Sequence, residues 1–200
     1  MPLKCFLDGK EILSFSMSND DWGQLKETYT GRGLTMPCCG VQAIPKVSPL
    51  GTRFFAHKAD ASCGSAGESE AHMRAKWVIA RAAVAAGWHA GTEVVGASPA
   101  GEEWVADVLC NRGKGRVAFE VQLSQQTEAE RNTRHVRYAA SGIRGCWLSS
   151  RVPDREVKDV PDFHLSMGNL REPRVTMAPQ FTLPLHEFVT GSLNGSLLSI

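Results

Sequence analysis

The order of six secondary-structure signals between residues 68 and 148 constrains the fold of this chain most. An Ala-rich stretch over residues 68–86 predicts a helix, and Gly87 suits the position just past its end. Four apolar strand-like runs and one further helix follow, separated by glycine-rich and polar segments, at residues 92–95, 104–109, 117–123, 127–141 (the helix) and 145–148. The order helix, three strands, helix, strand predicts an α/β fold in which helices pack on an α+β mixed sheet.

The residues on either side of this core differ from it in composition. Residues 34–64 are rich in glycine, proline and cysteine, and segments 41–47 and 53–57 indicate two strands joined by a turn. Residues 151–200 contain Pro-punctuated strand-like pieces. We therefore expect three regions, namely a small Cys-containing N-terminal β module at 1–66, the core at 67–150, and a C-terminal extension packed on the core at 151–200.

Composition and charge exclude several classes of protein. The 200 residues carry 22 Lys and Arg against 21 Asp and Glu, and 42% of them are hydrophobic, as in an ordinary globular domain. This balance excludes nucleic-acid binding through bulk positive charge, but it allows binding through a local basic face. No apolar run approaches the roughly 20 residues that span a bilayer, and Lys4, Asp8 and Lys10 stand where a signal peptide would be apolar. We expect a cytoplasmic protein with no membrane segment.

Two acidic residues lie inside apolar strand-like runs, where a charge is costly. Asp107 interrupts the run 104–109, and Glu120 interrupts the run 117–123. A buried carboxylate has to be paired, protonated or bound to a metal ion. If a hairpin joins the two strands, the carboxylates come close together, and Gln122 faces the same side of the sheet as Glu120. The amide of Gln122 could then orient a water molecule or a phosphate.

The predicted helix over residues 68–86 adds three polar residues. Glu68, His72 and Lys76 follow one another at intervals of four, so they share one side of the helix. With the two strand carboxylates, Glu68 would complete the oxygen ligands that suit Mg²⁺ or Mn²⁺. The alternative for each acid taken alone is structural: a strand aspartate at an edge, or a glutamate that favours a helix N-terminus.

The ordered set of helix glutamate, strand aspartate and strand Glu-x-Gln resembles the PD-(D/E)XK nuclease superfamily and, more narrowly, the competence protein CoiA family. The segments that carry this resemblance are residues 68–72 with Lys76, Glu93, residues 105–109, residues 119–124, Arg134 with Tyr138, and residues 147–148. In the preceding module, Gly40, residues 55–57 and Cys63 resemble the family's N-terminal part.

This resemblance implies a restriction-endonuclease-like core that cleaves DNA phosphodiester bonds with Mg²⁺ or Mn²⁺. It assigns the active centre to Glu68, Asp107, Glu120 and Gln122, of which the three acids would bind the ion. The superfamily often has a lysine at the position of Gln122, whereas CoiA-like sequences have glutamine there. Lys76 or Arg134 could supply the positive charge that this glutamine lacks.

The second predicted helix carries a candidate surface for DNA. Its basic and aromatic residues are Arg131, Arg134, His135, Arg137 and Tyr138. We expect Arg134 and Tyr138 to bind substrate phosphates, together with His72 and Lys76 of the first helix. The alternative for such a basic run is a solvated face held by ion pairs within the helix.

The sequence also fits proteins that are not enzymes. A catalytically inactive nuclease-like fold could bind DNA or another protein as an accessory in DNA uptake, recombination or defence. A zinc-stapled interaction module is a third alternative. A homodimer and association with other DNA-processing proteins are compatible with each of these functions.

Four residues of the N-terminal module could hold zinc, namely Cys38, Cys39, His57 and Cys63. The family-like knuckle would be Cys-Pro-x-Cys-Gly, and Met36 stands at its first cysteine position. Adjacent cysteines point in different directions in an extended chain, which would keep one of them away from the ion. The alternative is two packed thiols and a surface histidine. The expected role of zinc here is to tie the hairpin to the core and not to catalyse.

Overall fold

The computed structural model describes residues 2–58, 63, 68–124, 127–152, 160–178 and 181–196. The chain divides into two compact units, Met1–Trp77 and Val78–Ile200. Among the described residues, no helix combines the length and the hydrophobicity that crossing a membrane requires.

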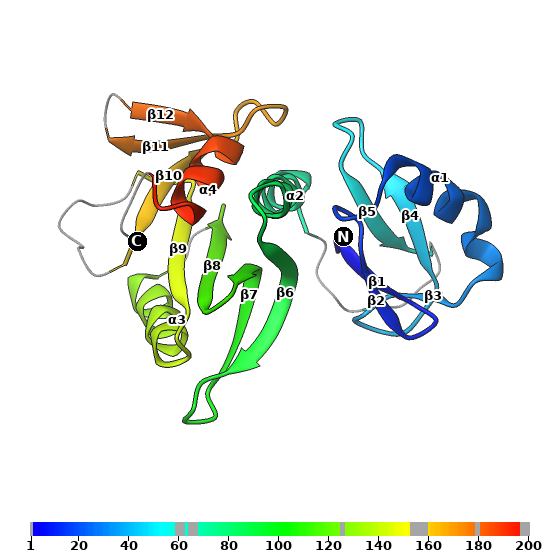
Figure 1. Ribbon diagram of the computed structural model, residues 1–200, viewed down its shortest axis with the longest axis horizontal. Coiled ribbons are helices and arrows are strands. Elements are labelled where there is room, and N and C mark those ends of the chain that lie inside the picture. Colours follow the sequence, from blue (N-terminus) through cyan, green and yellow to red (C-terminus); the bar gives the residue numbers. More distant parts are fainter. Residues whose placement is uncertain are drawn as a thin grey trace. The chain divides into compact units, whose positions relative to one another are not determined.

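The N-terminal unit contains two small β-sheets (Figure 1). Strands β1 (Lys4–Leu7), β2 (Lys10–Leu13) and β3 (Leu34–Thr35) form one sheet in the order β2-β1-β3. Strands β4 (Ala43–Val47) and β5 (Arg53–His57) form an antiparallel hairpin, which confirms the two strands that the sequence predicts there. The turn of this hairpin contains Gly51, whose φ of 76° suits a glycine.

Helix α1 (Asn19–Thr28), followed by the short 3-10 helix η1 (Tyr29–Gly31), lies in a stretch whose sequence is mostly polar. The hydroxyl of Ser18 caps α1 by accepting a hydrogen bond from the backbone N–H of Asp21 at 3.0 Å. Only Trp22 and Leu25 of this helix are buried. They join a core that also includes Cys5, Leu34, Met36, Ala43 and Phe55.

The C-terminal unit is built on a seven-stranded mixed sheet in the order β12-β11-β10-β9-β8-β7-β6. Its strands are β6 (His89–Ala97), β7 (Glu103–Arg112), β8 (Gly115–Gln122), β9 (Arg144–Ser149), β10 (Asp162–Ser166), β11 (Arg174–Ala178) and β12 (Phe181–Pro184). Strands β8, β9 and β10 run parallel, and the other neighbours are antiparallel. This mixed sheet confirms the predicted α/β class.

Two of the helices appear where the sequence predicts them. Helix α2 (Glu70–Ala85) includes the boundary between the units, and Gly87 follows it with a φ of 78°. Helix α3 (Glu128–Ala140) begins with a capping box, in which Thr127 and Glu130 each accept a hydrogen bond from the other's backbone N–H. Helix α3 lies along the sheet and contacts β7 and β9 (Figure 1).

An aromatic core holds α3 against the sheet. Tyr138 of α3 lies between Trp104 of β7 and Trp147 of β9, with ring centroids 5.5 and 6.0 Å away. The indole N–H of Trp104 donates to the hydroxyl of Ser141 at 2.9 Å. This packing fixes the face of α3 that the candidate site uses.

The C-terminal extension adds to the sheet instead of forming a separate layer. Strand β10 pairs in parallel with β9, and β11 and β12 continue from it. Helix α4 (Leu185–Leu193) contacts β11 and β12 and buries Leu185, Phe188, Val189 and Leu193. The sequence marks this helix only as a short apolar segment, because nine residues give too few turns to show a helical period.

Candidate functional site

A row of side chains crosses the centre of the seven-stranded sheet. The register of β7 and β8 pairs Val108 with Phe119, and its continuation by one residue brings Asp107 opposite Glu120. The next pairs in the row join Glu120 to Trp147 of β9, and Trp147 to Asp162 of β10. Paired residues on neighbouring strands share a face, so these acids lie on one face of the sheet. Asp107 and Glu120 are therefore neighbours on adjacent strands and on one face of the sheet.

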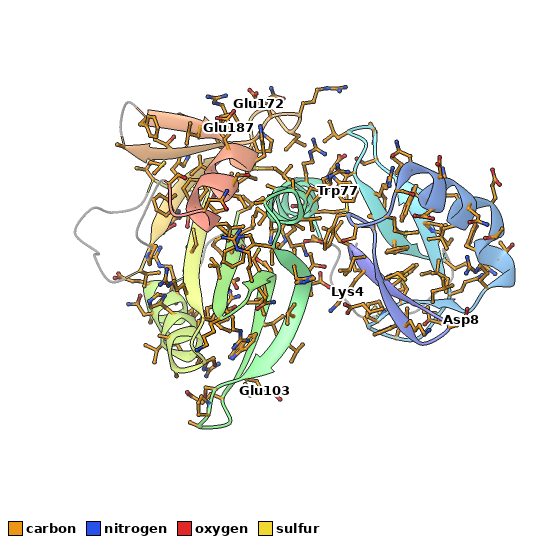
Figure 2. All side chains as sticks on the ribbon, viewed as in Figure 1. Lys4, Asp8, Trp77, Glu103, Glu172 and Glu187 are labelled. Carbon is orange, nitrogen blue, oxygen red and sulfur yellow. The ribbon has the colours of Figure 1, made fainter. Side chains whose placement is uncertain are left out.

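Three exposed acids of this unit lie away from the row. Figure 2 shows Glu103 at one end of the sheet, and Glu172 and Glu187 toward the other end. Their charges are exposed to solvent, whereas Glu120 is buried and, as whole residues, Asp107 and Asp162 are half-buried.

Glu120 is a buried carboxylate with only 1% of its surface exposed. It accepts hydrogen bonds from the hydroxyl of Tyr138 and from the guanidinium of Arg134. Burial and the nearby charge of Asp107 raise the pKa of Glu120 to about 7, against the opposing effects of Arg134 and Tyr138. A further positive charge beside Asp107 and Glu120 would therefore stabilise the ionised forms of both carboxylates.

Hydrogen bonds orient the other two strand residues. Oδ2 of Asp107 accepts the backbone N–H of Val121 at 2.8 Å, which fixes this half-buried carboxylate against β8. Gln122 follows Glu120 by two residues and faces the same side of the sheet. Its amide N–H₂ donates to the carbonyl and the hydroxyl of Ser124, at 2.9 and 3.0 Å.

Helix α3 supplies the partners of the buried acids. Arg134 pairs with Glu120 and also donates to the carbonyl of Val105 at 3.0 Å, and the hydroxyl of Tyr138 lies 2.9 Å from the same carbonyl. The sequence predicts that Arg134 and Tyr138 contact DNA, but the ring of Tyr138 is fully buried. Its hydroxyl donates to Glu120 and so positions this carboxylate.

The three polar residues predicted at intervals of four come together in the N-terminal unit. Oε1 of Glu68 lies 2.7 Å from Nδ1 of His72 and 2.6 Å from Nζ of Lys76. Burial alone would raise the pKa of Glu68, but the hydrogen bond from His72 and the charge of Lys76 hold it below its ordinary value. Lys76 is 1% exposed, so its ammonium is a buried charge that Glu68 balances.

The two groups of site residues belong to different units. Glu68, His72 and Lys76 lie in the N-terminal unit, and the acids of the row lie in the C-terminal unit. The role of Glu68 as a third metal ligand therefore stays a prediction from the resemblance. The expected contacts of His72 and Lys76 with DNA stay predictions as well.

Asp162 is a buried acid that the sequence does not single out. Its side chain is 6% exposed, accepts the hydroxyl of Ser149 at 2.7 Å, and pairs with Arg131 of α3. Burial raises the pKa of Asp162, although the hydrogen bond from Ser149 and the charge of Arg131 oppose this effect. The one sequence signal is an aspartate just before a short apolar run, which is also common at the start of an ordinary strand.

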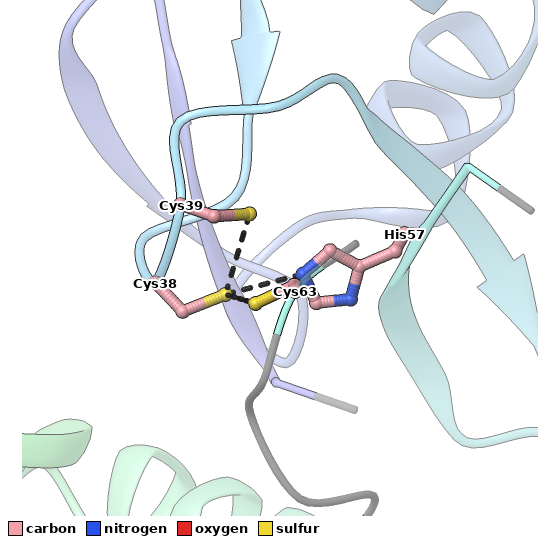
Figure 3. Close-up of side chains that lie close together, drawn as sticks. All are labelled: Cys38, Cys39, His57 and Cys63. Carbon is pink, nitrogen blue, oxygen red and sulfur yellow. Dashed lines mark hydrogen bonds between the residues drawn. The ribbon is translucent and has the colours of Figure 1, made fainter. Parts of the chain in front are cut away.

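The four predicted zinc ligands lie together in the N-terminal unit. The ligand atoms of Cys38, Cys39, His57 and Cys63 all lie within 4.8 Å of one another. Figure 3 shows the three sulfur atoms and the imidazole facing a common centre, with Cys38 Sγ 3.8 Å from Cys39 Sγ, 3.6 Å from Cys63 Sγ and 3.2 Å from Nε2 of His57. Sulfur ligands of a tetrahedral zinc ion at about 2.3 Å lie about 3.8 Å apart. The cluster fits a structural zinc site.

A turn lets both adjacent cysteines face this centre. Residues 37–39 form the turn, which Gly40 closes with a φ of 70° and a hydrogen bond from its N–H to the carbonyl of Met36 at 2.9 Å. The expectation that Cys38 and Cys39 diverge applies to an extended chain, and the chain is not extended here. Met36, at the position of the missing family cysteine, is buried in the core of the unit.

Alkylation of the folded protein should separate its cysteines into two groups of three. Burial raises the pKa of Cys5 and Cys110 to about 12 and also raises the pKa of Cys146. After treatment with a chelator, we expect the cluster thiols to react with iodoacetamide at least about a hundredfold faster than these three. Mass spectrometry of the labelled peptides measures this difference. Rapid labelling of any buried thiol in the folded protein would contradict it.

A mixed sheet that carries two neighbouring carboxylates on one face is compatible with a nuclease-like domain. The family model of the competence protein CoiA nuclease-like domain matches residues 68–187, which is more than half of the chain. The chain belongs to this family, and the resemblance drawn from the sequence is confirmed. A comparison with curated proteins finds no match.

Proposed function

We propose that this protein hydrolyses phosphodiester bonds of DNA in a reaction that depends on Mg²⁺ or Mn²⁺. The observation that carries the proposal is the placement of Asp107 and Glu120 on one face of the sheet, on adjacent strands, within the matched family domain. The charge of Asp107 raises the pKa of Glu120, as expected of two carboxylates that lie close together.

The chemistry of these side chains fits a hard divalent cation. Carboxylate oxygens are the ligands that Mg²⁺ and Mn²⁺ prefer. The buried carboxylate of Glu120 and the half-buried one of Asp107 repel each other, and a cation between them would remove this repulsion. When bound, such an ion polarises a phosphoryl oxygen and lowers the pKa of a water molecule.

The surrounding residues would hold the site in shape. Tyr138 and Arg134 keep Glu120 oriented, and the hydrogen bond from Val121 keeps Asp107 oriented. The amide of Gln122 is proposed to bind the attacking water or a phosphate oxygen. Glu68 is proposed as a further metal ligand, and its partner His72 as a contact for the phosphate backbone. Lys76, which is 1% exposed, would act by holding Glu68 in place.

One observation favours a second function, that of an inactive DNA-binding accessory protein. Arg134 already balances the charge of Glu120, so a cation would have to share or displace this guanidinium. If no cation enters, the fold would only bind DNA. Binding would then weaken in Arg134→Gln and would be unchanged in Asp107→Asn.

The test is cleavage of supercoiled plasmid and of circular single-stranded DNA with Mg²⁺, Mn²⁺ or EDTA. The proposal predicts cleavage of at least one substrate with either cation and none with EDTA. Absence of cleavage by a folded protein that binds DNA would overturn it and support the accessory function. Cleavage that persists in EDTA would also overturn it, because the proposed carboxylates act only through a cation.

A further inference from the structure

A polar cavity of about 250 Å³ lies beside Gln122, and the proposed function does not use it. It is formed by the ends of β8 and β9, the beginning of α3 and the start of β10. Its polar lining includes Gln122, Ser149, Arg131, Asp162, Arg151 and Glu128. Among the described residues that line it, Val152 alone is apolar.

The inner wall of the cavity is a preorganised guanidinium. One terminal nitrogen of Arg131 pairs with Asp162, and Asp162 is held from its other oxygen by Ser149 at 2.7 Å. Nε of Arg131 is buried and has no hydrogen-bond partner among the described residues. The Arg131 side chain as a whole is 20% exposed, so its guanidinium can also donate to an anionic oxygen in the cavity.

The charges around the cavity balance, so a phosphate would be held there by directed hydrogen bonds and not by net charge. Asp162 is balanced by Arg131, which leaves Arg151 as the exposed cation and Glu128 as the exposed acid. The first turn of α3 adds the positive end of a helix dipole. Guanidinium groups, hydroxyls and helix N-termini are the groups that proteins use to bind phosphate oxygens.

The place of the cavity relates it to the proposed cleavage site. Gln122 lies two residues beyond Glu120 on the same strand, which is about 6.6 Å along β8. A volume of about 250 Å³ is slightly below the range of typical small-molecule pockets, so it suits one nucleotide and excludes a duplex.

We propose that this cavity binds the sugar and phosphate of the nucleotide adjacent to the scissile phosphate. The position next to the scissile phosphate rests on the proposed function, whereas the binding of a nucleotide phosphate does not. Arg131 and Arg151 bind the phosphate, and Asp162 is a positioning residue that holds Arg131. The cavity therefore binds single-stranded DNA and not a duplex.

The test measures binding of a short single-stranded oligonucleotide and of a deoxynucleoside 5′-monophosphate in EDTA, where cleavage cannot occur. We expect the affinity for both ligands to fall about tenfold in Arg151→Gln and in the double variant Arg131→Gln with Asp162→Asn. The double variant avoids leaving Asp162 as a buried charge without a partner. Glu128→Gln should bind severalfold more tightly, because it removes the negative charge at the mouth. Lys114→Gln, in the exposed β7–β8 turn, is the matched control for loss of one positive charge.

Affinities of all three cavity variants equal to that of Lys114→Gln would overturn the proposal, as would weaker binding in Glu128→Gln. Its failure is distinct from failure of the proposed function. If the wild-type protein cleaves DNA and the KM is unchanged in Arg151→Gln and in the double variant, the proposed role of the cavity is rejected and the nuclease function is retained. Loss of nucleotide binding in these variants, in a protein that never cleaves, would keep the cavity as a phosphate site and remove the nuclease.

Discussion

Replacement of Asp107 by asparagine should lower metal-dependent cleavage of DNA by about a thousandfold or more. A bound cation contributes several kcal/mol to stabilising the charge that develops on the phosphate, and each 1.4 kcal/mol is about tenfold in rate. The asparagine oxygen can still accept the hydrogen bond from Val121, so the fold should be retained. Initial rates of plasmid nicking at saturating Mg²⁺ measure the effect.

A matched control lies in the same strand. Glu103 begins β7, is exposed, and uses only its backbone carbonyl to bind Arg137, at 3.1 Å. Glu103→Gln removes one negative charge, as Asp107→Asn does, and should leave the rate unchanged. Equal rates for the two variants would mean that Asp107 holds no ion and that any cleavage arises elsewhere.

Glu68→Gln tests the metal ligand predicted from the resemblance. If Glu68 acts on the ion from a distance, we expect the cleavage rate to fall by about 10–100-fold.

Loss of the zinc site should destabilise the N-terminal unit. We expect His57→Gln to reduce the zinc content well below one ion per chain and to lower the free energy of unfolding by at least about 3 kcal/mol. Isolated zinc-finger peptides gain about 10–16 kcal/mol from zinc, but this unit also has an apolar core around Trp22 and Phe55. For a chain of this length, the change corresponds to roughly 6–12 °C in the thermal midpoint.

Elemental analysis and thermal unfolding of the same samples measure both quantities. His89→Gln is the control, because His89 is an exposed histidine in the C-terminal unit. If the wild-type protein purifies without zinc and His57→Gln unfolds at the same temperature as His89→Gln, the cluster is only a group of neighbouring thiols. Cys38→Ser should repeat the result of His57→Gln, because Sγ of Cys38 lies within 3.8 Å of the ligand atoms of Cys39, His57 and Cys63.

The central elements of the fold could be predicted from the sequence because each has a strong local signal. The Ala-rich helix α2 ends before Gly87, and the strands β6, β7 and β8 are apolar runs separated by glycine-rich turns. The carboxylates were recognisable for the same reason, since a charge inside an apolar strand needs a partner. Helix α1 gave no such signal, because only two of its ten residues are buried.

The partners of the buried acids could not be predicted from local patterns. Arg134 and Tyr138 form a basic and aromatic run that fits a DNA-binding face, and only the packing of α3 directs them to Glu120. Asp162 reaches the same face because β10 pairs with β9, a choice of neighbour that local sequence does not specify. The direction of the Cys38 and Cys39 side chains likewise depended on a turn between strands.

The most direct test of the account is the anomalous scattering of Mn²⁺ in crystals of the protein soaked with this ion. We predict a peak between the side chains of Asp107 and Glu120, with metal–oxygen distances of roughly 2.0–2.6 Å. A fully occupied Mn²⁺ site elsewhere, with Glu120 still bonded to Arg134 and no peak at the carboxylate pair, would contradict the account.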